Sequence, residues 1–335
     1  MEERRKFIKT VGLTTAALGT MPYILKSHSV NPPPDGKRVG IIGLDTSHSI
    51  AFAKALNTQD NPDLLGYKVT AAYPHGSRDI ESSVSRIPGY IEDIKKLGVT
   101  IVESIEALLA EVDVILLETN DGRRHLEQVL PVLKAGKRVF IDKPVAASLE
   151  DTLAIYEASK QYNIPLFSSS SLRYIQGASE ARNGDLGKVM GATTWSPASL
   201  EKTHPDMYWY GVHGVEMLFT VMGTGCKEVY RVHTEGCDVI TGVWDDGKVG
   251  VFRGQRAGKL GYGGHVYGDK KSIDLGPYQG YLPLLIDIVK YFDTGQMPVT
   301  PEETIEIFAF MSAADESKKK KGKSVSLDKV ISKAR

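Results

Sequence analysis

The sequence of 335 residues has few cysteines, no excess of either charge and no long apolar run. Its two cysteines, Cys226 and Cys237, could pair in an oxidising compartment. One such bond cannot staple a chain of this size, so we assign the cysteines no function. The 41 basic and 41 acidic residues balance, which argues against nucleic acid or an acidic polymer as a partner. The mildly apolar residues 11–20 are too few to span a bilayer, so we expect no integral membrane span.

The N-terminal segment differs in character from the rest of the chain. RRKFIKT, at residues 4–10, comes before the weakly apolar stretch and resembles a twin-arginine export signal, with an ordinary basic N-terminus as the alternative. We expect a signal at residues 1–30, a proline-rich linker at residues 31–36 and a periplasmic or otherwise exported protein. No nicotinamide pool is maintained outside the cytoplasm. An exported nucleotide enzyme must therefore hold its cofactor tightly and recycle it in each turnover.

The first half of the chain alternates apolar, β-branched runs with amphipathic stretches. The apolar runs predict strands at residues 38–44, 67–73, 99–104, 113–119, 138–144 and 165–171. Between them, the helical stretch at residues 104–111 opens with a serine cap, and the one at residues 125–137 ends in a glycine stop. This alternation is typical of a Rossmann-like, doubly wound parallel sheet.

The second half has a different pattern. Residues 230–254 form two long apolar runs around the turn sequence DDGK, which is typical of a hairpin. We therefore predict an α/β protein in which the parallel sheet is followed by an α+β domain with a mainly antiparallel open sheet. The expected bounds are residues 37–145 for the dinucleotide-binding domain and residues 146–335 for the substrate and oligomerisation domain.

The first apolar run ends in Gly43, but the loop that follows lacks the further glycines of a dinucleotide-binding fingerprint. Asp45 stands near the expected phosphate position, where its charge would oppose a pyrophosphate. The same stretch is also a good helix cap. The stretch can be both a helix cap and a phosphate-binding loop if the hydroxyls of Thr46 and Ser47, with the free N–H groups at the start of the helix, bind phosphate. Asp45 then turns away, or faces a substrate together with His48.

The end of the second predicted strand bears on the choice of cofactor. NAD enzymes usually carry an acidic residue there for the ribose hydroxyls. This chain instead has Ser77 and Arg78, which would suit a 2′-phosphate and slightly favour NADP. Because arginine is common in loops, the expected cofactor stays NAD(P).

One long stretch carries a resemblance to a known family. LETNDGRRHLEQVLPVLKAGKRVFIDKP, at residues 117–144, resembles the signature of the Gfo/Idh/MocA oxidoreductases. That family has a Thr–Asn pair, a histidine, an Ala-Gly-Lys tripeptide and a Glu-Lys-Pro tripeptide in this order. The resemblance continues through YGVHGVEML, at residues 210–218, and through residues 298–325. It covers the chain from about Lys37 to the C-terminus.

The resemblance implies a set of cofactor-binding residues and two catalytic groups. The cofactor-binding set, joined to the loop residues above, is Gly43, Thr46, Ser47, Ser77, Arg78, Thr119, Asn120, His125, Asp142, Lys143 and Pro144. In the family the lysine of the tripeptide lies between nicotinamide and substrate, where an ammonium stabilises an alkoxide; a surface lysine is the alternative for Lys143. His213 matches the acid–base histidine of the family, with a satisfied core histidine as the alternative.

The region around His213 departs from the family pattern. Simple polyol dehydrogenases of the family have an aspartate four residues before this histidine, where this chain has Trp209. Asp206 is the nearest acidic substitute, so we predict it as a third catalytic residue. The residues expected to contact substrate are His48, Arg173, Trp209 and Glu216. A metal site formed by His204, Asp206, His213 and Glu216 is conceivable, but mixed sets of this kind are common by chance, and we predict no metal.

The sequence therefore favours an exported oxidoreductase that keeps its NAD(P) and acts on a sugar or sugar derivative. One alternative is a glycosidase or lyase that works through transient oxidation of the sugar. Another is a carbohydrate-binding protein that has lost its cofactor, an idea prompted by Asp45 and Trp209. We expect a small-molecule substrate, no nucleic acid partner and a homo-oligomer.

Overall fold

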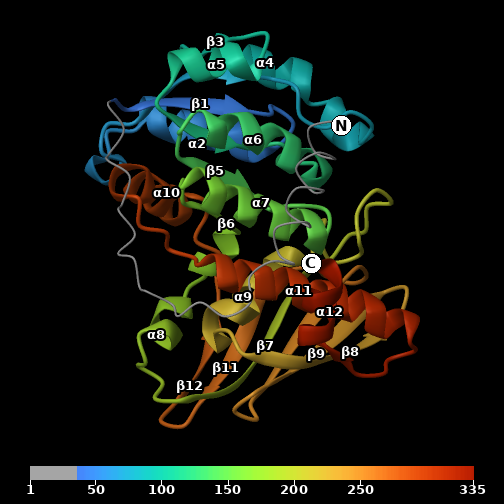
Figure 1. Ribbon diagram of the computed structural model, residues 1–335. Helices are drawn as coiled ribbons and strands as arrows, with labels where there is room; N and C mark the ends of the chain where they lie inside the picture. Colours follow the sequence, from blue (N-terminus) through green and yellow to red (C-terminus); the bar gives the residue numbers. More distant parts are fainter. Residues whose placement is uncertain (1–35) are drawn as a thin grey trace, which may run out of the picture.

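The computed structural model describes residues 36–335. The predicted export signal, and the predicted linker up to residue 35, lie outside the described residues. Figure 1 shows a parallel sheet with its helices in the upper part of the molecule and a second sheet in the lower part, with α11 (Pro301–Lys319) between them.

The first sheet has the strand order β3-β2-β1-β4-β5-β6, and every neighbouring pair is parallel. Its strands are β1 (Arg38–Ile42), β2 (Lys68–Tyr73), β3 (Thr100–Ile101), β4 (Val114–Leu117), β5 (Val139–Asp142) and β6 (Leu166–Ser169). The order reverses between β1 and β4, the point at which ligands bind beyond the carboxyl ends of such strands. The predicted doubly wound sheet is confirmed. It includes β6, which lies past residue 145, where the sequence analysis ended the first domain.

Helices pack around this sheet, and serine side chains begin two of them. The helices are α2 (Ser47–Thr58), α3 (Glu81–Val84), α4 (Ile87–Lys95), α5 (Ile105–Glu111), α6 (His125–Lys134) and α7 (Leu149–Tyr162). Ser104 accepts a hydrogen bond from the Ala107 amide at 3.1 Å at the start of α5. Ser148 accepts one from the Asp151 amide at 3.0 Å at the start of α7. Each bond satisfies one of the free N–H groups that every helix start leaves.

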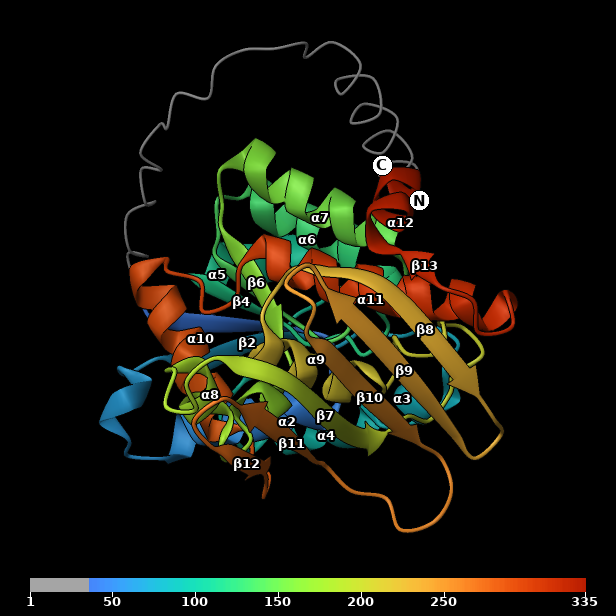
Figure 2. The same cartoon turned by 90° about the horizontal axis from the view of Figure 1, so that it is seen from below.

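The second sheet has the order β12-β11-β7-β10-β9-β8-β13, and β7 and β10 are its parallel pair. Its strands are β7 (Val189–Pro197), β8 (Cys226–His233), β9 (Cys237–Trp244), β10 (Val249–Gln255), β11 (Gly263–Gly268), β12 (Ser272–Leu275) and β13 (Val325–Ser326). Seen from below in Figure 2, these strands spread side by side. The other pairs are antiparallel, and β9 and β10 form a hairpin around the predicted turn. Both predictions are confirmed.

One helix of the second half, α10 (Leu282–Thr294), packs against the first sheet. Besides α10 and α11, the helices of the second half are α8 (Ala178–Arg182), α9 (Val212–Met222) and α12 (Leu327–Ala334). The Tyr291 hydroxyl of α10 accepts a hydrogen bond from the Val139 amide of β5 at 3.3 Å. Arg138 donates to the Phe292 carbonyl at 2.5 Å. These contacts tie β5 to α10.

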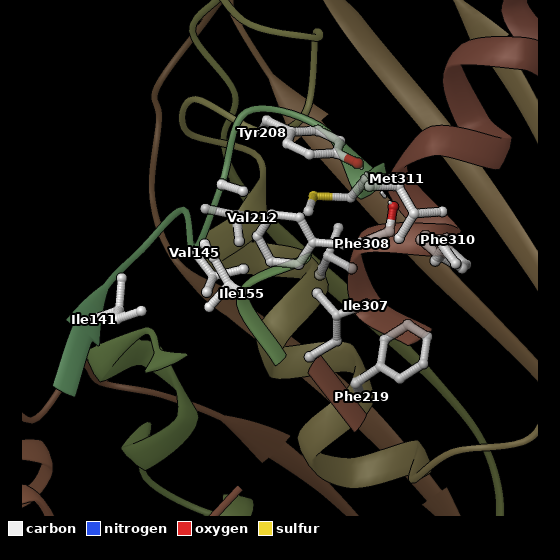
Figure 3. Close-up of a cluster of buried hydrophobic side chains, with 14 of the residues drawn as sticks. Ile141, Val145, Ile155, Tyr208, Val212, Phe219, Ile307, Phe308, Phe310 and Met311 are labelled. Carbon is white, nitrogen blue, oxygen red and sulfur yellow. Dashed lines mark hydrogen bonds between the residues drawn. The ribbon is translucent and has the colours of Figure 1, made fainter. Parts of the chain in front are cut away.

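An apolar core joins the two halves. Figure 3 shows side chains from β5, α7, α9 and α11 gathered in one cluster, with Val145, Ile155, Val212 and Phe308 among them. These side chains are almost completely buried, and burial of each contributes about 1.5–3 kcal/mol. The cluster therefore fixes the start of α9 relative to the end of β5.

No helix within residues 36–335 is both long and apolar enough to cross a membrane. Cys226 and Cys237 are both free thiols; Cys226 is buried and Cys237 is partly exposed.

Candidate active site

A cavity of about 390 Å³ lies at the carboxyl ends of the parallel strands, where the two halves of the chain meet. The first half contributes Thr46, Ser47, His48, Ser82, Arg86, Asn120 and Lys143. The second half contributes Ser171, Leu172, Ser199, Trp209, Tyr210, His213, Tyr262, Tyr278 and Tyr281. One wall is thus polar and cationic, and the other is mainly aromatic.

Lys143 directly follows β5 and lines the polar wall. Its Nζ lies 3.8 Å from Oδ2 of Asp142, and the same oxygen lies 2.9 Å from Nδ1 of His48. Burial alone would raise the pKa of Asp142, but the neighbouring His48 and Lys143 lower it to about 2. Asp142 is therefore an anion that orients both His48 and the lysine ammonium.

Glu118 directly follows β4 and is completely buried. Within the described chain, neither of its carboxyl oxygens has a hydrogen-bond partner. Burial and the neighbouring Asp142 raise the pKa of Glu118 well above its ordinary value, against the opposing effect of Lys143. The sequence analysis did not single out Glu118, although an acidic residue directly after a buried strand is itself a signal.

His213 lies in the first turn of α9 and lines the cavity opposite the polar wall. Its Nδ1 lies 2.6 Å from the Ser170 hydroxyl, and no described residue bonds to its Nε2. Burial, with Lys143 and His48 nearby, lowers the pKa of His213 well below its ordinary value. The imidazole is therefore neutral near neutral pH and able to accept a proton.

Five aromatic side chains, Trp209, Tyr210, Tyr262, Tyr278 and Tyr281, form the opposite wall. The hydroxyls of Tyr210 and Tyr262 lie 2.7 Å apart, and the Tyr278 hydroxyl lies 2.8 Å from that of Ser171. The Tyr281 and His48 rings pack edge to face, and their centroids lie 4.7 Å apart. Such a wall offers apolar ring faces together with fixed hydroxyl groups.

Asp45 turns away from the cavity. Its Oδ2 accepts hydrogen bonds from the Ser77 amide at 2.7 Å and the Ser77 hydroxyl at 2.5 Å, and its Oδ1 accepts one from the Asn120 amide at 2.9 Å. The cap of α2 is Thr46, which accepts from the His48 amide at 3.5 Å. Asp45 is therefore neither the helix cap nor a charge facing the cavity. It ties the loop after β1 to the loops after β2 and β4.

Three residues expected at the catalytic centre lie elsewhere. Asp206 pairs with Arg231 at 2.6 Å and with Lys318 at 2.7 Å, and it is not among the residues that line the cavity. Arg173 and Glu216 form a buried ion pair at 2.7 Å, which also keeps them out of the lining. Partners distant in sequence draw these side chains away. The expected catalytic role of Asp206 and the expected substrate contacts of Arg173 and Glu216 therefore do not agree with the structure.

Part of the predicted cofactor-binding set supports the cavity without lining it. His125 has Nε2 2.6 Å from the Thr119 carbonyl and Nδ1 3.1 Å from the Val145 carbonyl, so it staples the loops after β4 and β5. Gly43 has a φ of +91°, and a Cβ there would lie 2.5 Å from the Thr119 hydroxyl, so the loop requires glycine. Pro144 follows Lys143 and is likewise absent from the lining.

The two residues that favoured NADP have other partners. Ser77 is hydrogen-bonded to Asp45, and Arg78 lies 3.6 Å from Glu127. The arginine that lines the cavity is instead Arg86, just before α4.

The four side chains considered as a metal site do not meet. Their partners within residues 36–335 are Thr203 and Asp121 for His204, Arg231 and Lys318 for Asp206, Ser170 for His213, and Arg173 and Ser169 for Glu216.

The sequence analysis missed Arg86 and the tyrosines on the aromatic wall. Tyr262, Tyr278 and Tyr281 stand in the glycine-rich stretches GYGG and GPYQGY. Aromatic rings on such loops would be exposed unless they faced a pocket, which is the signal that could have found them. Nothing in the sequence around Arg86 marks it apart from other loop arginines.

The cavity fits the phosphate and nicotinamide side of a dinucleotide. Thr46, Ser47 and His48 present the N-terminal turn of α2 to it, and that turn holds no acidic residue. A helix start of this kind favours an anion. Arg86 adds a cation, and the carboxylate of Asp45 is directed away.

Comparisons with known proteins agree with this geometry. The model of an oxidoreductase family with an NAD-binding Rossmann fold, GFO_IDH_MocA, matches residues 37–169. The myo-inositol 2-dehydrogenase of Thermotoga maritima is 22% identical over 346 aligned residues, covering 88% of this chain and 99% of that protein. An uncharacterized oxidoreductase of Streptococcus pneumoniae is 26% identical over 121 residues, 34% of this chain and 32% of that protein. The chain thus spans about a third of that relative.

A solved structure extends the likeness over both sheets. Scyllo-inositol dehydrogenase from Lactobacillus casei, crystallised with NAD(H) and scyllo-inositol, has a TM-score of 0.69 at 16% identity. The match covers 87% of this chain and 99% of that one, and it shows a shared fold. The chain is therefore similar to the Gfo/Idh/MocA oxidoreductases, and its residues 37–169 match the NAD-binding Rossmann domain of that family.

Proposed function

We propose that this protein is a dehydrogenase that oxidises a secondary alcohol of a sugar or cyclitol and keeps its nicotinamide cofactor bound. The observation that carries the proposal is the pairing of the Lys143 ammonium with a neutral His213 in one cavity walled by aromatic rings. The names of the two inositol dehydrogenases above support a polyhydroxylated ring as substrate.

A bound nicotinamide ring would supply the hydride acceptor. Lys143 holds the substrate oxygen and stabilises the negative charge that develops there, since Asp142 fixes the ammonium from behind. His213 accepts the hydroxyl proton on Nε2, while Ser170 holds Nδ1 and sets the orientation of the ring. Trp209 and the tyrosines pack against the C–H face of the substrate ring and exclude water.

The cofactor of this proposal is NAD rather than NADP, because Asp45 holds the amide and hydroxyl of the buried Ser77, which are then not offered to a 2′-phosphate. Export through the twin-arginine signal at residues 1–30 is part of the same proposal. A cofactor that stays bound allows turnover where no free nicotinamide is supplied, because a second substrate with a carbonyl group would take the hydride back and return the bound cofactor to its oxidised form.

Mass spectrometry of protein purified from its native host and then denatured tests the cofactor. We expect NAD in near-stoichiometric amount. Absence of any nucleotide, together with no binding by calorimetry, would contradict the proposal and favour a carbohydrate-binding protein. A product that has lost or exchanged its aglycone with no net change in cofactor would favour the glycosidase or lyase alternative.

We also propose that the second sheet forms a homo-oligomer through its outer face. Met190, Tyr230, Val232, Val249 and Tyr267 are exposed on β7, β8, β10 and β11. Apolar side chains gathered on one open sheet usually mark an interface. Native mass spectrometry is expected to give a multimer, and Val232→Lys to dissociate it. A monomer in the unsubstituted protein would contradict this.

A further inference from the structure

Glu118 is a buried acid that the proposed chemistry does not use. It directly follows β4, at the start of the loop that carries Asn120, and it has no exposed surface. Both of its carboxyl oxygens lack a partner among the described residues. A carboxyl group left in this state is costly, because burial removes its hydration and nothing replaces it.

The carboxylate of Asp142, which lies near Glu118, also lacks a hydrogen-bond donor at one of its oxygens. One polar atom each from Glu118, Asp142 and His48 lie within 4.8 Å of one another. Asp142 Oδ2 is occupied by His48 at 2.9 Å and by Lys143 at 3.8 Å, whereas its Oδ1 has no partner in residues 36–335. Two neighbouring buried carboxyl groups, with polar atoms within 4.8 Å of each other, therefore hold three oxygens that receive no hydrogen bond from the described residues.

A proton on Glu118 would give these carboxyl oxygens the hydrogen-bond donor that they lack. If both acids were ionised, the single ammonium of Lys143 would face two buried carboxylates, and like charges at this distance repel strongly. With a proton on Glu118, the charges of Asp142 and Lys143 cancel, and the new O–H can reach a free acceptor. A divalent cation would satisfy the oxygens too. It would, however, leave excess positive charge beside Lys143.

We propose that Glu118 is a positioning residue that retains its carboxyl proton at neutral pH and donates it to Oδ1 of Asp142. Asp142 is then held at both oxygens, by Glu118 on one and by His48 and Lys143 on the other. This fixes the direction of the Lys143 ammonium and of the His48 ring where they face the cavity. The effect on turnover rests on the proposed function, but the shared proton does not.

Every charged group around Glu118 bears on this assignment. Asp142 and Lys143 face it from the end of β5, and Asp45 faces it from the loop after β1. His48 adds an imidazole from α2 beside Asp142. Burial and the two aspartates raise the pKa of Glu118, and Lys143 alone opposes them.

Infrared spectroscopy of the full-length protein tests the proton directly. At neutral pH we expect a protonated-carboxyl stretch that shifts when glutamate is labelled with ¹³C and disappears in Glu118→Gln. Asp45→Asn is the matched control, because Asp45 is a buried acid of the same crevice whose oxygens already receive donors. The band is expected to survive in it. A wild-type spectrum without this band would overturn the proposal.

The pH dependence of stability gives a second readout. Folded protein that holds a proton which the unfolded chain releases, above the ordinary glutamate pKa of about 4.3, loses stability as pH rises. Glutamine holds no such proton and can still donate to Asp142. The Tm of Glu118→Gln relative to wild type is therefore expected to rise from about pH 4 to about pH 8. A difference that stays constant with pH would contradict a retained proton.

Two further measurements separate this idea from its rivals. Elemental analysis is expected to find no stoichiometric divalent metal; a metal lost in Glu118→Gln would overturn the proposal in favour of a cation site. Glu118→Leu, which cannot donate, is expected to have a kcat at least about 10-fold below that of Glu118→Gln. Equal kcat values would contradict the positioning role. The infrared result needs no substrate, so it stands even if the proposed dehydrogenase activity fails.

Discussion

Two buried charge clusters in this molecule differ in how completely their charges are matched. In the Arg231 cluster, Arg231 contacts Asp238 at 2.7 Å, Asp206 at 2.6 Å and Asp315 at 2.5 Å. Asp206 is shared further with Lys318, so the cluster is saturated. In the crevice cluster, formed by His48, Glu118, Asp142 and Lys143, the oxygens of Glu118 and one oxygen of Asp142 are unmatched, and Lys143 faces a cavity.

This difference indicates that the Arg231 cluster stabilises the fold, whereas the crevice cluster can act on a ligand. The Arg231 guanidinium is buried and each of its three nitrogens meets a carboxylate, so it is not presented to a ligand and instead holds β8, β9 and α11 together. An ammonium with one distant carboxylate partner can turn its remaining donors to a substrate. The four predictions that follow test this contrast, from the largest expected effect to the smallest.

The largest effect is expected when the saturated cluster loses its cation. Arg231→Met leaves three buried or partly buried carboxylates facing one another, and removing one partner of such a set costs about 3–5 kcal/mol. We expect a loss near the upper end of that range in urea unfolding, with cofactor affinity unchanged in the protein that stays folded. A loss below about 1 kcal/mol would show that the cluster is not structural.

The next effect falls on turnover rather than stability. Lys143→Met is expected to lower kcat about 10³-fold, because it removes the cation that meets charge developing in the transition state. Tm is expected to change little, since the side chain lines a cavity. Steady-state kinetics beside a thermal melt check both parts. Turnover within a few-fold of wild type would remove Lys143 from the chemistry.

The third substitution is expected to lower both the unfolding free energy and the affinity for nucleotide. Asp45→Ala leaves the amide and hydroxyl of Ser77 and the amide of Asn120 without their acceptor. We expect a loss of about 3 kcal/mol in unfolding free energy, together with weaker nucleotide binding as the loops after β2 and β4 separate. Calorimetry measures the second part. Tighter nucleotide binding would mean that Asp45 repels the phosphates after all.

The smallest effect is expected at Asp206, the residue that motif reasoning placed in the catalytic set. Asp206→Asn keeps the shape of the side chain but weakens its pairing with Arg231 and Lys318, which is partly exposed to solvent. We expect about 1 kcal/mol of destabilisation and a kcat within about twofold of wild type. A hundredfold loss of kcat would restore Asp206 to the catalytic set.

Local patterns in the sequence were enough to predict the fold. The apolar runs before Gly43 and Lys143 gave parallel strands, the serine at 104 begins α5, and the DDGK turn joins β9 and β10. In the site, four residues that the sequence singled out, His48, Lys143, Trp209 and His213, line one cavity, and their catalytic and substrate-binding roles stay predictions. The two catalytic candidates among them lie at the end of a strand and in the first turn of a helix. Both places follow from the local sequence.

The remaining site residues depend on partners far away in the sequence. Glu216 was expected to contact substrate, but Arg173, which itself contacts Glu303, draws it into the interior. No local pattern records such a partner. Glu118 was missed for the opposite reason. Its significance lies in the absence of a partner, which only the packed structure reveals.

The central claim is that hydride passes from a ring carbon of the substrate to a nicotinamide that stays on the protein. A single-turnover reaction with a cyclitol deuterated at its carbinol positions tests it most directly, with mass spectrometry of the nucleotide released on denaturation. The account predicts one deuterium in the nicotinamide of the wild-type protein and none in Lys143→Met, which still retains its nucleotide. A wild-type nucleotide without deuterium, across inositols and common hexoses that bind, would contradict it.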